Sequence, residues 1–129
     1  MSVLLFDIIP DARRSMLRIT MRGHWITETV KEYRVAVAKA VATLIENGCK
    51  RERIIAFVDA REVSAQSQDV IEEYQKNMVR DGRVPRRLAT LLSSALFKRQ
   101  VERIAMPNQR IFSHEHEALA WLLSSDEDA

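Results

Sequence analysis

Two kinds of hydrophobic pattern alternate along this chain and together predict an α/β fold. Residues 16–22 alternate well between apolar and polar side chains, with Leu17, Ile19 and Met21 on one side, which is the period of a strand with one solvent-facing side. Residues 54–58 are apolar throughout, as in a central strand that is buried on both faces. Residues 27–46 carry apolar side chains at steps of three and four, which predicts an amphipathic helix, and the Asn-Gly pair that ends in Gly48 is a common helix stop.

The remaining segments extend this alternation. The patterns predict strands over 3–9, 88–92 and 110–112, and helices over 67–79, over 94–105 and after Ser113. The first strand is expected to stop at Pro10. The resulting order ββαβαβαβα predicts a single mixed, mainly parallel five-stranded sheet, because strands that alternate with helices form right-handed crossovers. The solvent-facing side of the second strand places the helices mostly on one face of the sheet.

The composition restricts the class of protein but indicates no particular activity. The 129 residues suit one domain, expected over 1–124, followed by a disordered acidic tail over 125–129. The net charge of +2 does not by itself indicate nucleic acid, so no specific nucleic-acid partner is expected. The single cysteine, Cys49, excludes an internal disulfide and favours a reducing cytosol. No run approaches the ~20 apolar residues of a membrane span, so we expect a cytoplasmic protein without a membrane partner.

Three segments carry a resemblance to a known family. They are GHWITETVKEY (23–33), FVDAREVSAQSQDVIEEY (57–74) and FSHEHEALAWLL (112–123). With the element order, they resemble the STAS-like proteins, which share the fold of the sporulation anti-sigma-factor antagonists and of the cytoplasmic domain of sulfate transporters. The resemblance covers nearly the whole chain and is strongest to small, stand-alone bacterial STAS/SEC14-like proteins. It implies a SpoIIAA-like fold and a regulatory, protein-binding role.

In the antagonists, a serine at the start of the helix after the central strand is reversibly phosphorylated. Ser67 occupies that place here, with Ser64 as the alternative, although the Asp and Gly of the family pattern are absent. A phosphate at a helix N-terminus is stabilised by free backbone N–H groups and by the helix dipole. The alternative interpretation is that Ser67 or Ser64 simply caps the helix.

Two further surfaces are candidates for binding. Around the same loop, the candidate partner surface consists of Arg61, Gln66 and Gln68. The candidate anion patch consists of Arg80, Arg83, Arg86 and Arg87, which would attract an anionic partner, unless these arginines form an ordinary solvated face. His114 and His116 are two apart, a spacing that does not converge on a metal from one helix. No catalytic residue, metal or cofactor is therefore expected.

Two functions fit these observations. The first is a non-enzymatic interaction module that binds an unidentified protein through the edge containing 59–69, with modulation at Ser67. The second is a carrier of a small apolar or anionic ligand in a pocket between sheet and helices, as the SEC14-like relatives imply. Carriage predicts a cavity lined by residues such as Phe57, Val70, Tyr74 and Phe97, and an interaction module predicts that these are tightly packed. A homodimer through an edge strand also fits a small protein.

Overall fold

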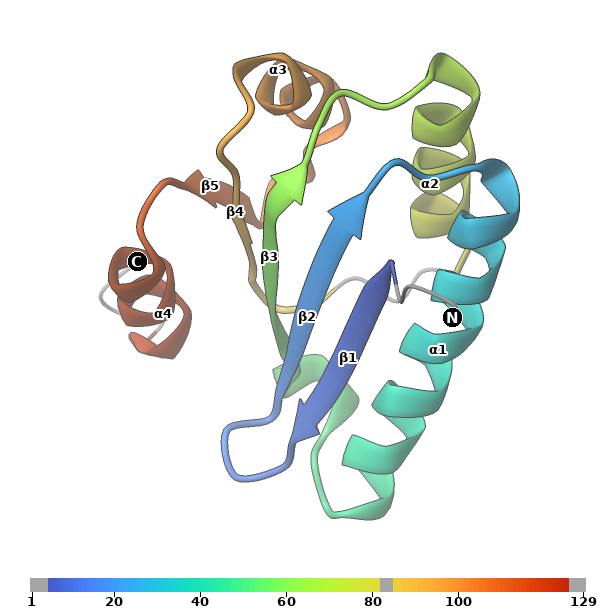
Figure 1. Ribbon diagram of the computed structural model, residues 1–129. Coiled ribbons are helices and arrows are strands. Elements are labelled where there is room, and N and C mark those ends of the chain that lie inside the picture. The colour runs from blue at the N-terminus through green and yellow to red at the C-terminus, as the bar shows by residue number, and fades with distance from the viewer. Residues whose placement is uncertain (1–4, 82–84, 126–129) are drawn as a thin grey trace.

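A computed structural model of the protein describes residues 5–81 and 85–125. Its sheet has the strand order β1-β2-β3-β4-β5, with β1 antiparallel to β2 and the other neighbours parallel (Figure 1). The strands are β1 (Phe6–Asp11), β2 (Met16–Gly23), β3 (Ile55–Val63), β4 (Leu88–Leu91) and β5 (Gln109–Phe112). The helices are α1 (Thr27–Glu46), α2 (Gln68–Asp81), α3 (Ala95–Ile104) and α4 (Glu115–Leu123), and a short 3-10 turn, η1, spans Arg51–Arg53. The predicted mixed, mainly parallel five-stranded sheet is confirmed.

The helices divide unequally between the two faces of the sheet. Helices α1, α2 and α3 bury their apolar side chains in one core, together with Ile54, Ala56 and Val58 of the central strand region. Helix α4 packs on the opposite face, against Ile55 and Phe57, and Figure 1 shows it apart from α1 and α2. The predicted burial of the central strand on both faces and the predicted excess of helices on one face are therefore both confirmed.

Two strands run further than their sequence patterns predict. Strand β1 continues through Pro10 to Asp11, and this is tolerated because β1 is an edge strand, where the missing N–H of a proline breaks no ladder on the open side. Strand β3 continues through polar residues to Val63 because β2 runs beside it and pairs Gly23 with Val63. On its other side β3 has already lost its partner, since β4 pairs no further than Asp59.

The stop of helix α1 follows the predicted signal. Gly48 adopts φ +94°, a left-handed conformation that glycine takes without a steric penalty. Its N–H donates to the carbonyl of Ile45 over 3.0 Å, and the N–H of Cys49 donates to the carbonyl of Leu44 over 3.0 Å. These two bonds form a Schellman motif, which satisfies the last carbonyls and turns the chain toward η1.

Candidate functional site

The loop between β3 and α2 brings Ser67 to the start of a helix. Ser67 directly precedes α2, and its carbonyl accepts a hydrogen bond from the N–H of Ile71 over 3.1 Å. The exposed hydroxyl of Ser67 donates to the carboxylate of Asp69, and this hydrogen bond lowers the pKa of Asp69. Ser67 therefore has the N-cap position, but its hydroxyl binds a neighbouring side chain. Ser64, the alternative, is also exposed in this loop.

Gln66 does not belong to the candidate partner surface, because it is 8% exposed and its amide is used inside the fold. Its Oε1 accepts from the N–H of Trp25 over 2.8 Å, and its Nε2 donates to the carbonyls of Ser64 (2.8 Å) and Gly23 (3.3 Å). Its backbone exchanges two bonds with the side chain of Gln100, of 2.8 and 2.7 Å. A buried amide must be satisfied in this way. Gln66 thus ties the loop to the start of α1 and to α3.

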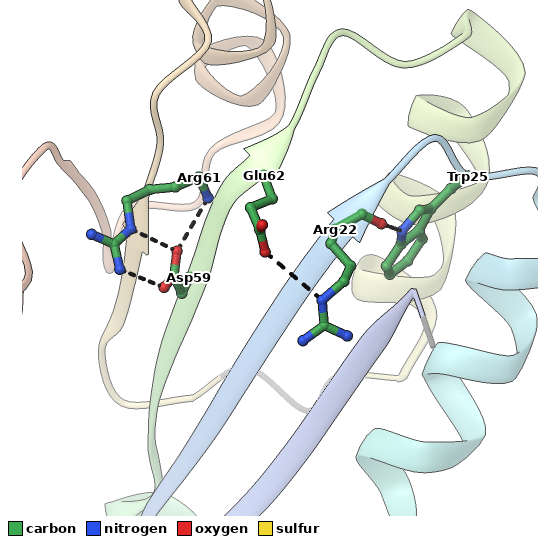
Figure 2. A network of polar contacts seen from close by, with 5 residues as sticks. All are labelled: Arg22, Trp25, Asp59, Arg61 and Glu62. Carbon is green, nitrogen blue, oxygen red and sulfur yellow. Dashed lines mark hydrogen bonds and ion pairs between the residues drawn. The ribbon is translucent and has the colours of Figure 1, made fainter. Parts of the chain in front are cut away.

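Arg61 and Gln68, the other two members of the candidate partner surface, are exposed. Arg61 donates through two nitrogens to the carboxylate of Asp59, over 3.0 and 2.8 Å (Figure 2). The hydrogen bonds from Arg61 hold the pKa of Asp59 below its ordinary value, against the opposing effect of partial burial. Glu62, on the same strand, pairs with Arg22 over 3.8 Å (Figure 2). This end of β3 therefore displays paired charges.

The candidate anion patch changes in composition. Arg87 is 5% exposed, and its guanidinium donates to the carbonyls of Trp121, Ser124 and Ser125. It also lies over the ring of Trp121, 5.4 Å from the centroid. Arg87 therefore anchors the end of α4 and is not an exposed patch residue.

Of the other arginines in the candidate anion patch, the structure describes the side chain of Arg86 alone. Arg86 is half-buried and has a further interaction within the protein. Arg83 and the side chain of Arg80 lie outside the described residues, as do residues 126–129 of the expected acidic tail. The patch as a whole stays a prediction.

A cavity of about 140 Å³ lies between the sheet and helices α1 and α2. We call it the α1 cavity. Strands β2 and β3 form its floor, α1 forms its longest wall, and Tyr74 reaches it from α2. Its apolar lining includes Leu17, Val30, Val37, Val41, Ile54 and Ala56. Small side chains contribute to the space, since Ala38 on α1 and Ala56 on β3 both border it. An apolar recess with a few polar groups at its border is the usual form of a small-molecule site.

Two tyrosines give the α1 cavity a polar end. Burial raises the pKa of Tyr33, and the neighbouring Tyr74 hydroxyl raises it further. Burial also raises the pKa of Tyr74. Both therefore stay neutral phenols near pH 7. The ring of Tyr33 also packs against Phe6 and Trp25, with centroids 5.5 and 5.3 Å apart, so this end of the cavity is rigidly built.

A second, smaller cavity of about 60 Å³ lies between the sheet, α2 and α3. Tyr74 and Val58 border both cavities and separate them. Of the four lining residues that carriage predicts, Tyr74 borders both cavities, whereas Val70 and Phe97 border the second. Phe57 lies on the opposite face of the sheet, so its predicted place in the lining is wrong. Arg34 and Arg51, which also line the α1 cavity, were missed by sequence reasoning because both resemble ordinary surface arginines.

The described residues contain no group of three or more histidine, cysteine or acidic side chains that could hold a metal ion. His114 precedes α4 as its N-cap, and its ring centroid lies 6.0 Å from that of His116. The spacing argument assumed that both histidines lie on one helix, which is wrong for His114. Within the part of the chain that the structure describes, no helix has the length and apolar character needed to cross a membrane.

The fold matches a solved structure, an uncharacterized protein of the DUF3478 family with a SpoIIAA-like fold from Shewanella loihica PV-4. The TM-score is 0.67 over 95% of this chain and 98% of that chain, at 22% sequence identity. No protein-family model matches the chain, and no curated protein does. A likeness at this identity establishes a shared fold. This protein therefore has the SpoIIAA-like fold, and its resemblance to the STAS-like proteins is confirmed at that level.

Proposed function

We propose that this protein is a non-enzymatic STAS-like module that binds and carries a small, largely apolar ligand in the α1 cavity. The observation that supports this proposal is the cavity itself. Tight packing against α1 and α2 would favour an interaction module, whereas about 140 Å³ of space lies there. Carriage, the second of the two functions that the sequence suggests, is therefore the one that the geometry favours.

The energy of an unfilled apolar space supports the same conclusion. The α1 cavity opens to solvent beside the exposed Arg51, so its apolar lining meets water when no ligand is bound. Removing apolar surface from water is favourable by roughly 25 cal/mol per Å². A ligand that fills the space recovers contacts and stabilises the folded state, because it binds the folded chain alone.

Carriage is tested first with protein from the natural host. Native mass spectrometry of untagged protein should show a small molecule bound in a 1:1 ratio, which is lost on denaturation. A second measurement uses toluene as a neutral apolar probe, which should raise the melting temperature of the wild type. Ala38→Leu fills the α1 cavity and should abolish this shift. Ala36→Leu, on the same helix but outside the lining, is the matched control and should retain it. An unchanged melting temperature in wild type at saturating toluene would contradict carriage.

The interaction module stays as a second candidate because of the loop over 64–67. Gln66 fixes the backbone of this loop through its buried amide, while Ser64 and Ser67 remain exposed. A rigid loop that displays a hydroxyl at a helix start suits a protein contact that phosphate could alter. Pull-downs with wild type and Ser67→Asp test this role. Equal recovery of every partner by both proteins would exclude a switch at Ser67.

A further inference from the structure

The charges that border the α1 cavity have one sign. Arg34 on α1 and Arg51 on η1 both line it, and none of its described lining residues is acidic. The two tyrosine hydroxyls stay neutral because burial raises the pKa of Tyr33 and of Tyr74. An otherwise apolar cavity bordered by cations discriminates in favour of an anionic group.

The exposure of the two arginines indicates where that group would lie. Arg51 is exposed and yet lines the cavity, so the cavity meets solvent beside it. Arg34 is half-buried and has a further interaction within the protein, so we assign the principal contact to Arg51. A guanidinium binds a carboxylate with two parallel hydrogen bonds. A ligand with its carboxylate at Arg51 places its apolar body inward, against Val37, Val41 and Ile54.

The size of the cavity limits that apolar body. A cavity of about 150 Å³ lined by leucine, isoleucine and phenylalanine admits benzene, and the α1 cavity measures about 140 Å³. With its carboxylate held at the opening, a ligand has room inside for about one ring or for a chain of similar volume. A long acyl chain exceeds that space.

We propose that the α1 cavity binds a small monocarboxylate whose apolar body is about the size of a benzene ring, with the carboxylate at Arg51. The proposal rests on the proposed function and adds the chemical class and size of the ligand. Phenylacetate represents the aromatic form and hexanoate the aliphatic form.

Isothermal titration of the full chain tests whether the site prefers an anionic ligand. The affinity for phenylacetate is compared with that for phenylacetamide, its neutral counterpart. We expect phenylacetate to bind about tenfold more tightly, because hydrogen bonds to charged groups are stronger than neutral ones. Arg51→Gln should remove this preference and leave toluene binding within about twofold, since the apolar body is untouched. Arg53→Gln, on the same turn but outside the lining, is the matched control and should retain the preference.

A series of unbranched carboxylic acids tests how large an apolar body the α1 cavity accepts. Affinity should rise about fourfold for each added methylene, from butanoate to hexanoate, as apolar surface is buried. It should then level off, so that dodecanoate gains little over octanoate. A rise of equal steepness through dodecanoate would overturn the size limit.

The outcomes separate this inference from the proposed function. If toluene binds but phenylacetate has no advantage over phenylacetamide, the anionic class is wrong and apolar carriage stands. If Arg53→Gln removes the preference as fully as Arg51→Gln does, general surface charge explains it and the site at Arg51 is wrong. If neither toluene nor any acid binds, both proposals fail.

Discussion

The two faces of the sheet differ in how completely they are packed. Beneath α4, a core of seven residues has no member more than 2% exposed, and none of the seven borders either cavity described above. Beneath α1 and α2, the larger core contains the α1 cavity. The α4 face is therefore closely packed, whereas the α1 face contains unfilled space.

The difference follows from where large and small side chains lie. On the packed face, Ala118 of α4 is fully buried, so the helix approaches the sheet closely. On the other face, the aromatic side chains gather beside Tyr33, near the start of α1, while Ala38 and Ala56 border the cavity. The small side chain of Ala118 lets α4 pack closely, whereas small side chains on α1 and β3 leave part of the cavity unfilled.

The largest expected effect lies on the packed face. Phe57 is 2% exposed, so Phe57→Ala should destabilise the protein by about 3–5 kcal/mol, the usual cost of emptying a buried aromatic site. Chemical denaturation with urea measures the free energy of unfolding. A loss below about 1 kcal/mol would show that this face is not the rigid one.

A matched pair of alanine-to-leucine substitutions measures how differently the two faces are packed. Ala118→Leu should destabilise by about 1–3 kcal/mol, because extra methylenes have no room in a packed core. Ala38→Leu adds the same atoms on the cavity face and should leave stability unchanged or raise it by about 1 kcal/mol, as cavity filling commonly does. Urea denaturation of both variants gives the comparison. Equal losses from the two would mean that the faces are packed alike.

A smaller effect is expected at the exposed end of β3. The pKa of Asp59 is held below its ordinary value chiefly by hydrogen bonds from Arg61, so this pair stabilises the folded state at neutral pH. That contribution is lost as the pH falls through the lowered pKa of Asp59. Arg61→Ala should raise the pKa of Asp59, so that the remaining dependence shifts to higher pH. Carboxyl-carbon NMR titration measures this shift, with Arg53→Ala as a control that leaves Asp59 unchanged. An Asp59 pKa that stays the same in Arg61→Ala would disprove the assignment.

The fold could be predicted because its signals are local. The continuous apolar run at 54–58, the alternation at 16–22 and the helix stop at Gly48 each depend on neighbouring residues, and all three are found in the structure. The extension of β3 to Val63 could not be predicted in this way. Its residues are polar, and they form a strand because β2 lies beside them.

The site was predictable in part. The place of Ser67 follows from the strand-loop-helix order. Gln66 was assigned to the candidate partner surface from its place in the 59–69 loop, and its burial depends on acceptors and donors from residues as distant as Trp25 and Gln100. The α1 cavity depends on side-chain volumes summed over β2, β3, β4, α1 and α2, which no local sequence pattern reports. Ala38 and Ala56 both border the cavity, and this becomes apparent once the structure places α1 against β3.

Methyl NMR tests most directly whether the α1 face admits a ligand and the α4 face does not. Toluene is titrated into protein with labelled isoleucine, leucine and valine methyl groups. We expect saturable shifts at Val30, Val37 and Val41, which line the α1 cavity, and unchanged signals at Ile55, Leu91 and Leu122 of the packed face. Saturable shifts of equal size on both faces, or none on the α1 face at saturating toluene, would show that the two faces do not differ in this way.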